Sequence, residues 1–352
     1  MKFGLLFNTD YHAEAHGSPS QYYGHLLDQV ELAEDHGFDS AWFGEHHYSA
    51  YSFGAPAVMA TAAAARTTRI RLGTGVSVLP IHNPIRLAEE YATLDVLSGG
   101  RLEYGVGRGF LRYALDLFGV EEDESTGRYR EALEIILRAW SEKGLISHQG
   151  EFWSFEDYQF FPPPLQEPHP PIYASATRTP ESFKWTASKG LHLATACFVP
   201  DKASVRDGIR LYRQTLEDSG HDPQAFDVAG VFQMFCGESH DEAHRIAGGR
   251  VIDYLEFFGS IDARSPHRSK AYSHHTGGTQ EMFAGVTSEL LDKDGLLLVS
   301  DANGLIERIE WAREYYGLNY FLLEIGQGGL AHDQVEASLT RFAKEVMPRF
   351  QG

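Results

Sequence analysis

Short apolar segments alternate with longer amphipathic segments along almost the whole chain. Apolar runs of this length are typical of buried strands, and apolar positions that recur every three or four residues are typical of helices. Eight strands are expected, at residues 2–7, 39–44, 69–79, 101–107, 171–176, 192–199, 227–236 and 319–326. Strands that alternate with helices indicate a parallel sheet. A count of eight favours a (β/α)8 barrel of the TIM type, and a doubly wound open sheet is the alternative.

Capping residues mark several of the expected helix ends. Asn83 before a proline is typical of a helix start, because its side chain accepts a hydrogen bond from a free N–H and the proline already has a helical φ. Gly99 is expected to end the same helix. Thr179 repeats the starting signal, again before a proline, and Asp301 should cap the helix that precedes the eighth strand.

Two long segments interrupt the alternation of strands and helices. Residues 147–170 are aromatic and then rich in proline, so we expect an extended excursion that returns to the fifth strand. Residues 259–300 follow the seventh strand, are polar in their middle, and exceed an ordinary connection in length. Because this insertion follows a strand end, we expect it to be a mobile lid over the catalytic face. We interpret residues 1–352 as one barrel domain.

The charge of the chain limits its partners. Its 352 residues include 49 Asp and Glu against 30 Lys and Arg, and the net charge of -19 opposes binding to nucleic acid or to anionic membranes. No apolar run approaches the ~18 residues of a membrane-spanning helix. The first ten residues lack the pattern of a signal peptide, and we expect Cys197 and Cys236 to be reduced, buried thiols. These features predict a cytoplasmic protein.

Candidate binding groups follow the fourth and fifth strands. Residues Ala176, Thr177, Arg178 and Thr179 precede a helix that starts with proline, and the free N–H groups and positive dipole end of that helix favour an anionic phosphate. Arg108 can add a cation that binds the same group in a bidentate manner. These residues predict a site for the phosphate of a mononucleotide cofactor. The alternative is that Thr179 only caps the helix and that Arg108 only forms a surface ion pair.

Glu45, His46 and His47 follow the second strand and raise the question of a metal site. Neighbouring residues on a strand point to opposite faces, so the two histidines cannot both face one ion unless the strand has already ended. We therefore predict no metal. Two interpretations stay open: an ordinary hydrogen-bonded histidine at a strand end, or a single histidine that exchanges a proton near neutral pH.

In combination, these motifs resemble the bacterial luciferase-like flavin-dependent monooxygenases, and in particular the pattern of the luciferase alpha subunit. The resemblance covers nearly the whole chain. It is carried by MKFGLLF, by HGFDSAWFGEHHYS, by RIRLGTGVSVLPIHNPIRLAEEYATLDVLSGGRLEYGVGRGF, and by NYFLLEIG with FAKEVMPRF near the end. No one of these segments is specific alone, but their combination is.

The resemblance implies a (β/α)8 barrel that binds reduced FMN from a separate flavin reductase. It implies that O2 and this flavin form a C4a-peroxide, which oxygenates a small apolar organic substrate, an aldehyde being one candidate. It also implies a homodimer or a heterodimer. Two alternatives stay open: a deazaflavin-dependent oxidoreductase with the same barrel, and a non-catalytic partner subunit.

The resemblance also implies roles for residues near the flavin ring. His46 matches the family histidine that is implicated in proton transfer, and Glu45 precedes it as in the motif, so both are candidate catalytic residues. Gly75 and Val76 fall where the family has a non-proline cis peptide bond under the ring.

Other implied roles concern the phosphate and the substrate. Arg108 matches the phosphate-binding arginine of the family, and residues 176–179 match the phosphate loop to within a residue. Gly107 stands where luciferase has a reactive cysteine. We expect this change to leave room for a different substrate, and we do not expect light emission.

Overall fold

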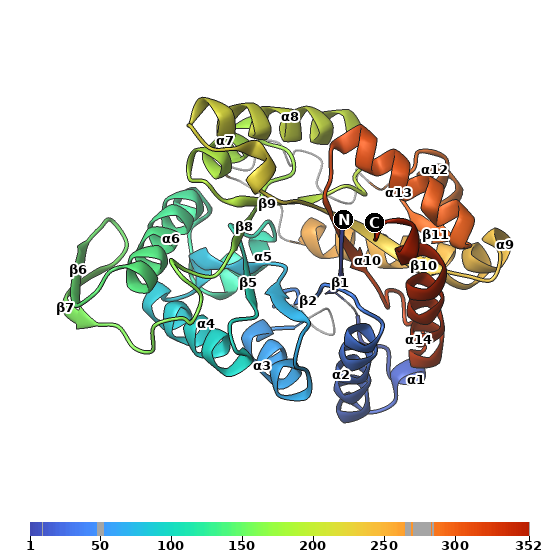
Figure 1. Cartoon of the computed structure of the whole chain (residues 1–352), viewed down its shortest axis with the longest axis horizontal. Helices are drawn as coiled ribbons and strands as arrows, with labels where there is room; N and C mark the ends of the chain where they lie inside the picture. Colours follow the sequence, from blue (N-terminus) through green and yellow to red (C-terminus); the bar gives the residue numbers. More distant parts are fainter. Residues whose placement is uncertain (9, 48–52, 265–268, 270–282, 284, 352) are drawn as a thin grey trace.

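The computed structural model describes residues 1–8, 10–47, 53–264, 269, 283 and 285–351. Eight parallel strands of these residues form a closed barrel (Figure 1), in the order β1 (Lys2–Phe7), β2 (Ser40–Phe43), β3 (Arg71–Thr74), β5 (Leu102–Gly107), β8 (Ile172–Ser175), β9 (His192–Ala196), β10 (Val228–Cys236) and β12 (Tyr320–Glu324). The barrel closes because β10 pairs with β9 and with β12, and β12 pairs with β1. All eight predicted strands and the (β/α)8 fold are confirmed.

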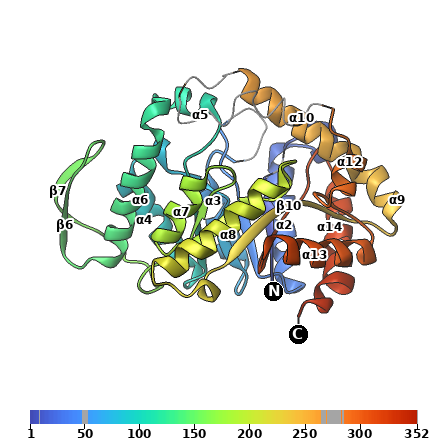
Figure 2. The ribbon, with the colours of Figure 1, turned by 90° about the horizontal axis from the view of Figure 1, so that it is seen from above.

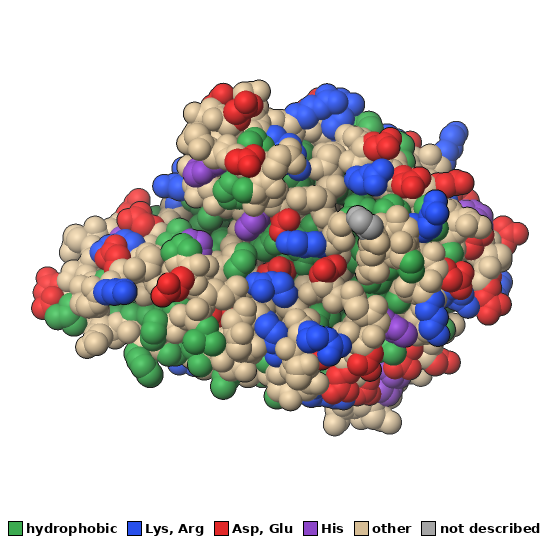
Figure 3. Space-filling view, in the orientation of Figure 1, with side chains coloured by type: hydrophobic (Ala, Val, Ile, Leu, Met, Phe, Trp, Pro, Cys, Tyr) green, Lys and Arg blue, Asp and Glu red, His purple; other side chains and the backbone are tan. Residues whose placement is uncertain are grey.

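Helices surround the barrel in both ribbon views (Figures 1 and 2). They are α1 (Ala13–His16), α2 (Pro19–Asp35), α3 (Pro56–Arg66), α4 (Pro84–Ser98), α5 (Arg112–Leu117), α6 (Ser125–Ser141), α7 (Pro180–Ser188), α8 (Lys202–Asp218), α9 (His240–Ala243), α10 (Gly249–Arg264), α12 (Ser288–Lys293), α13 (Ala302–Tyr316) and α14 (His332–Arg341). Among the described residues, no helix is both long and apolar enough to cross a bilayer. Acidic and basic side chains are mixed over the face seen in Figure 3, so the net charge is not gathered in one patch there.

The predicted caps set the ends of the helices that support the site. Asn83 Oδ1 accepts hydrogen bonds from the backbone of Ile85 and Arg86, at 3.0 and 3.3 Å. Gly99 ends α4 in the left-handed conformation, with φ of 72°. Asp301 caps α13 through the backbone N–H of Gly304. Local sequence therefore fixes where these helices begin and end.

The third predicted strand is divided in the structure. The segment expected at 69–79 forms β3 and then β4 (Ser77–Val78), which pairs with β5. The peptide bond between Gly75 and Val76, which lies between the two pieces, is cis. This bond has the conformation that the resemblance implied.

The two long insertions contain structure that the sequence pattern did not predict. Within 147–170 the chain completes an antiparallel hairpin of β6 (Leu145–Gln149) and β7 (Ser154–Gln159), which projects away from the barrel in Figures 1 and 2. Within 259–300, residues 265–268, 270–282 and 284 lie outside the described residues. The described parts are the last turns of α10, then α12 and β11 (Leu298–Ser300), which pairs with β10. A mobile lid at 259–300 stays a prediction.

Trp42 fills the interior of the barrel. Its ring is completely buried and meets the edges of Tyr173 and Tyr320, with centroid separations of 5.0 and 6.2 Å. A Cβ atom at Gly73 would come within 2.4 Å of the indole, and one at Gly105 within 2.9 Å. The two glycines therefore leave the space that the tryptophan occupies.

A buried carboxylate holds the polar edge of this aromatic group. Glu103 accepts hydrogen bonds from Trp42 Nε1 at 3.2 Å and from the Tyr320 hydroxyl at 3.0 Å, and Arg71 Nε donates to its other oxygen at 2.8 Å. Burial raises the pKa of Glu103 although Arg71 opposes the shift. The interior below the cavity is thus packed and hydrogen-bonded.

Both cysteines are buried, free thiols. Burial raises the pKa of Cys197, and it raises the pKa of Cys236 to about 12. Both are therefore protonated near neutral pH. The sequence prediction of reduced, buried thiols is confirmed.

Adding a methyl group at Gly73 should test the fit of Trp42. We expect Gly73→Ala to lower the free energy of unfolding by about 1–3 kcal/mol, because the new Cβ overlaps the indole ring. Gly24→Ala is the matched control: Gly24 lies within α2 with open space around it, so alanine should be neutral or stabilise by up to about 1 kcal/mol. Urea denaturation measures both values, and equal stabilities of the two variants would contradict the packing argument.

Candidate active site

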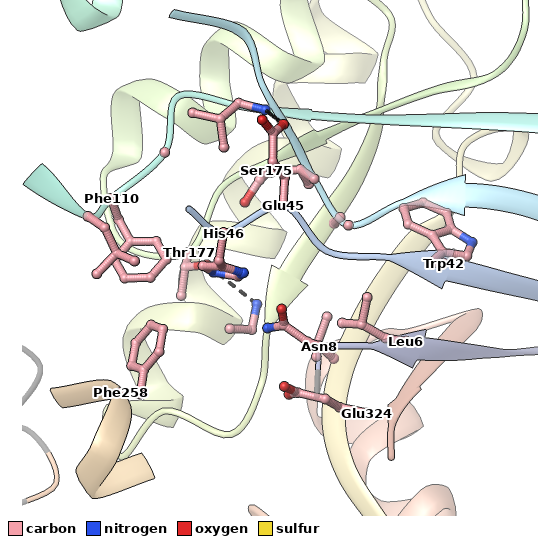
Figure 4. Close-up of a pocket in the computed structure, with 18 of the residues that line it drawn as sticks. Leu6, Asn8, Trp42, Glu45, His46, Phe110, Ser175, Thr177, Phe258 and Glu324 are labelled. Atoms are coloured by element: carbon pink, nitrogen blue, oxygen red, sulfur yellow. Dashed lines mark hydrogen bonds between the residues drawn. The ribbon is translucent and has the colours of Figure 1, made fainter. Parts of the chain in front are cut away.

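Two adjoining cavities open at the carboxyl ends of the barrel strands, and Figure 4 shows one of them. The first is lined by Glu45, His46, Gly75, Val76 and Glu324, and its walls are mostly apolar. The second contains the loop after β8. The cavities have common lining residues, among them Val76, Gly109, Phe110, Ser175, Thr177, Ala196, Phe198 and Phe258. They therefore form one continuous site on the face where barrel enzymes carry their chemistry.

His46 faces the cavity from the end of β2. Its imidazole meets the rings of Phe110 and Phe258, with centroid separations of 6.2 and 6.4 Å, and these rings also touch each other at 4.9 Å. Burial in this aromatic wall lowers the pKa of His46 to about 3. The imidazole is therefore neutral near pH 7 and is a weaker base than an exposed histidine, so proton exchange near neutral pH stays a hypothesis for this residue.

Glu45 points away from His46 into a hydrogen-bonded group. Its oxygens accept hydrogen bonds from His47 Nε2 at 2.8 Å, from His82, and from the backbone N–H of Val78 at 2.7 Å, which Figure 4 marks. Burial opposes the charge on Glu45, but these hydrogen bonds outweigh it and lower the pKa to about 2. Glu45 is therefore an ionised carboxylate whose hydrogen bonds support the strand end that carries His46.

β2 ends at Phe43, before the two adjacent histidines, so the alternation of faces expected for a strand does not decide their positions. Both histidines line the first cavity, but His47, like His82, hydrogen-bonds to Glu45, whereas His46 contacts the aromatic wall. Glu45, His47 and His82 have possible ligand atoms within 4.8 Å of one another, so the structure brings together a metal-type group that the sequence did not. Both carboxylate oxygens already accept hydrogen bonds, which is a sufficient account of the group without an ion.

Positive charge gathers at the far end of the second cavity. Arg108, Arg130 and Arg178 line it together with the N-terminus of α7. Arg108 Nη1 donates to Thr126 Oγ1 at 2.9 Å, and the guanidinium of Arg130 stacks on Trp185, 5.6 Å from the ring centroid. Three cations beside a helix start form a suitable site for a phosphate.

The loop after β8 lies where the sequence predicted it. Ala176, Thr177, Arg178 and Thr179 all line the second cavity. Thr177 Oγ1 accepts a hydrogen bond from Ala196 N at 3.4 Å (Figure 4), and Thr179 Oγ1 bonds to Ser182 Oγ at 2.7 Å. The side chain of Thr179 makes no hydrogen bond that caps α7. Pro180 has no N–H group, and the N–H groups of Ser182 and Phe183 donate to the backbone oxygen of Thr179 at 3.0 and 3.4 Å. The start of α7 therefore contributes mainly the positive end of the helix dipole.

Val76 occupies the space beside Gly107. A Cβ atom at Gly107 would come within 2.5 Å of Val76 Cγ2 and 3.6 Å of Ser175 Cβ. We expected the missing side chain to leave room for a different substrate. That expectation was wrong at this point, because the side chain of Val76 fills the room.

Glu324 was missed as a functional residue, although the pattern placed it at the end of the eighth strand. It lines the first cavity, and its oxygens accept hydrogen bonds from the Tyr254 hydroxyl at 2.6 Å and from Gln233 Nε2 at 3.0 Å. Burial raises its pKa to about 7, although these hydrogen bonds oppose the shift. A carboxyl group that titrates near neutral pH can donate or accept a proton. Its position in the sequence was the available signal, since the hydrogen bonds around it come from segments distant in the chain, among them α10 and β10.

The charge of Glu45 should contribute stability that depends on pH. The pKa of Glu45 is lowered from 4.5 to about 2, so this contribution is complete above pH 4.5 and is lost as the pH falls towards 2. We expect Glu45→Gln to lower the free energy of unfolding by about 1–3 kcal/mol at pH 7 and by less at pH 3. Glu90→Gln, which breaks only an exposed pair with Arg86, should cost under about 0.5 kcal/mol at pH 7. An equal effect of Glu45→Gln at both pH values, measured by urea denaturation, would argue against the shifted pKa.

Comparison with known proteins agrees with this geometry. The chain matches the family model of luciferase-like monooxygenases over residues 1–318. It is 26% identical to the oxygenase component of the flavin-dependent trigonelline monooxygenase of Acinetobacter baylyi, over 99% of this chain and 96% of that one. It is also 26% identical to the F420-dependent glucose-6-phosphate dehydrogenase of Amycolatopsis mediterranei, over 93% and 94%.

A solved structure of similar length supports the same assignment. The chain superimposes on a monooxygenase of Streptomyces bottropensis with a TM-score of 0.85 and 26% identity, over 99% of this chain and 100% of that one. The resemblance found in the sequence is thus confirmed by the family match and by the fold, and the chain belongs to the luciferase-like monooxygenase family.

Proposed function

We propose that the protein is a monooxygenase that uses reduced FMN and O2 to oxygenate a small apolar organic substrate. The observation that carries this proposal is the continuous cavity, cationic at one end and apolar at the other, with two proton-exchanging groups between its walls. Reduced flavin, when bound, supplies the electrons that activate O2.

The residues of the second cavity suit the phosphate of FMN. Arg108 and Arg178 offer charge-assisted hydrogen bonds, and the N-terminus of α7 offers the positive end of the helix dipole. The flat ring would extend towards Gly75 and Val76, which line the first cavity. These are the cofactor-binding residues that the sequence predicted, and their roles stay part of the proposal.

The residues of the first cavity would manage protons. His46, neutral at pH 7, would accept a proton from substrate or cofactor at its ring nitrogen, and Glu324, in its protonated form, would donate one. Glu45 would act as a positioning residue, because its charge is already engaged by His47 and His82. The aromatic wall of Phe110 and Phe258 would exclude water from the reacting groups.

The lining of the cavity and the named relatives also suggest the class of substrate and the partner protein. An apolar wall suits an uncharged substrate, and an aldehyde stays one candidate. The relative in Acinetobacter baylyi is named an oxygenase component, which favours a separate flavin reductase as the source of reduced FMN. A cytoplasmic location and a homodimer or heterodimer stay predictions from the sequence.

A deazaflavin-dependent oxidoreductase is the second candidate function. The relative in Amycolatopsis mediterranei is named as F420-dependent and is as similar in sequence as the monooxygenase relatives. Such an enzyme would transfer a hydride rather than oxygen. A non-catalytic partner subunit is disfavoured by the proton-exchanging groups that line the cavity, His46 and Glu324.

Titration with both cofactors separates the first two candidates. The wild-type chain should bind reduced FMN more tightly than the deazaflavin, and Arg108→Ala should weaken FMN binding by about 10–100-fold, since a hydrogen bond to a charged group contributes ~1.5–3 kcal/mol. Arg128→Ala is the control, because Arg128 stacks on Phe152 and pairs with Glu124. Tighter binding of the deazaflavin, measured by anaerobic fluorescence titration, would favour hydride transfer.

Rapid mixing with O2 tests the proposed proton groups. Starting from the anaerobic complex with reduced FMN, the absorbance of oxidised flavin should return more slowly than with free FMN. With an apolar aldehyde as probe, His46→Ala should slow oxygenation by about 10²–10⁴-fold while leaving FMN affinity nearly unchanged. The rate should fall as the pH rises through about 7, where Glu324 loses its proton, and Glu324→Gln should remove that dependence. A wild-type rate that is constant from pH 6 to 8 would exclude the role of Glu324.

A further inference from the structure

A second group of potential metal ligands lies outside the cavity, where the segment after β10 begins. The helix α9 continues into the π-helical turn η4 (His244–Gly248), so His240 and His244 are neighbours one turn apart, with ring centroids 4.5 Å from each other. Asp292 reaches them from α12, which lies beside α9 in Figures 1 and 2. Each of the three residues offers one ligand atom, and these three atoms all lie within 4.8 Å of one another.

The spacing of these atoms fits one tetrahedral ion. His244 Nε2 lies 3.4 Å from Asp292 Oδ1, and His240 Nε2 lies 3.9 Å from Asp292 Oδ2. Bonds of ~2.1 Å at a tetrahedral angle separate two ligands of Zn²⁺ by about 3.4 Å. The first separation has this value. The second is longer and runs to the other oxygen of Asp292, so the partly exposed His240 side chain would have to rotate towards the ion.

The ring of His244 lacks the hydrogen bond that its burial requires. Its Nε2 atom is buried and makes no hydrogen bond among the described residues, although Asp292 Oδ1 lies 3.4 Å away at ion-pair distance. Buried ring nitrogens are normally satisfied, so this atom calls for an additional group. The cavity group of Glu45, His47 and His82 differs, because hydrogen bonds already join its members.

Surrounding side chains hold the three ligands in position. Ser300 Oγ bonds to His240 Nδ1 at 3.2 Å, which leaves Nε2 of that ring to face Asp292. Arg308 donates a hydrogen bond to Asp292 Oδ1 and so orients the carboxylate. The positive charge of Arg308 would, however, repel a bound cation. Glu289 interacts electrostatically with His244, and its negative charge would attract a cation bound there. Hydrogen bonds of this kind commonly orient the ligands of protein metal sites.

We propose that His240, His244 and Asp292 bind a divalent transition-metal ion, with Zn²⁺ as the best match. Two imidazoles and one carboxylate suit Zn²⁺, and water would complete four-coordination. The ion would join η4 and α9 to α12. It would thereby connect the start of the segment between β10 and β11 to its end, at a distance in sequence of about fifty residues.

Calorimetric titration of the metal-free full-length chain with ZnCl2 tests this site. We expect one saturable event per chain, and His240→Asn or His244→Asn should weaken it by at least ~10-fold. Ser300→Ala should weaken it by about 10-fold without removing a ligand. Because His240 is partly exposed, its variant is expected to fold, and circular dichroism verifies this.

His25→Asn is the matched control. His25 stacks on His332 with centroids 4.0 Å apart, yet it belongs to neither group of three ligands among the described residues, so its loss should leave affinity unchanged. Co²⁺ in place of Zn²⁺ should give the visible absorption of a tetrahedral ion in the wild type and not in His240→Asn. Absence of saturable Zn²⁺ binding, or equal affinity in the wild type and in His240→Asn, would overturn the proposal.

Discussion

The indole ring of Trp42 fills the interior of the barrel, and the neighbouring strands are built to accept it. Gly73 and Gly105 provide the space, and Glu103 receives the indole N–H. β2 ends one residue after Trp42, at Phe43, and after Gly44 the chain presents Glu45 and His46. Because a packed ring resists displacement, the position of Trp42 determines where this strand end, and therefore the imidazole of His46, lies above the floor of the cavity.

The cavity separates two kinds of chemistry along its length. Cations from β5, α6 and the β8 loop gather at one end, while aromatic rings surround His46 at the other. The apolar surroundings suppress charge on His46 and raise the pKa of Glu324, whereas Glu45 stays ionised because three donors face it. Three titratable groups at the ends of β2 and β12, the strands on either side of β1, thus differ in how they titrate.

Sequence was sufficient for the strands, the caps and the loop positions, because each depends on local pattern. Asn83, Gly99 and Asp301 act on backbone groups within a few residues, and periodicity reports which face is buried. Contacts between segments that are distant in the sequence could not be predicted from local pattern. His82 reaches Glu45 from 37 residues away, Arg130 faces the cavity from the middle of a helix, and Val76 fills the space at Gly107. The hairpin of β6 and β7 was missed because both strands are mostly exposed, so the sequence shows no clear buried apolar face.

The two sulfhydryl groups give the molecule a further property. Both cysteines are packed in the interior and keep their protons at neutral pH, and Gly107, which lines the second cavity, has no side chain that an oxidant could attack. Oxidants attack the thiolate form of an accessible cysteine. Neither cysteine therefore offers an oxidant such as hydrogen peroxide an accessible thiolate, and we expect both thiols to react slowly with it.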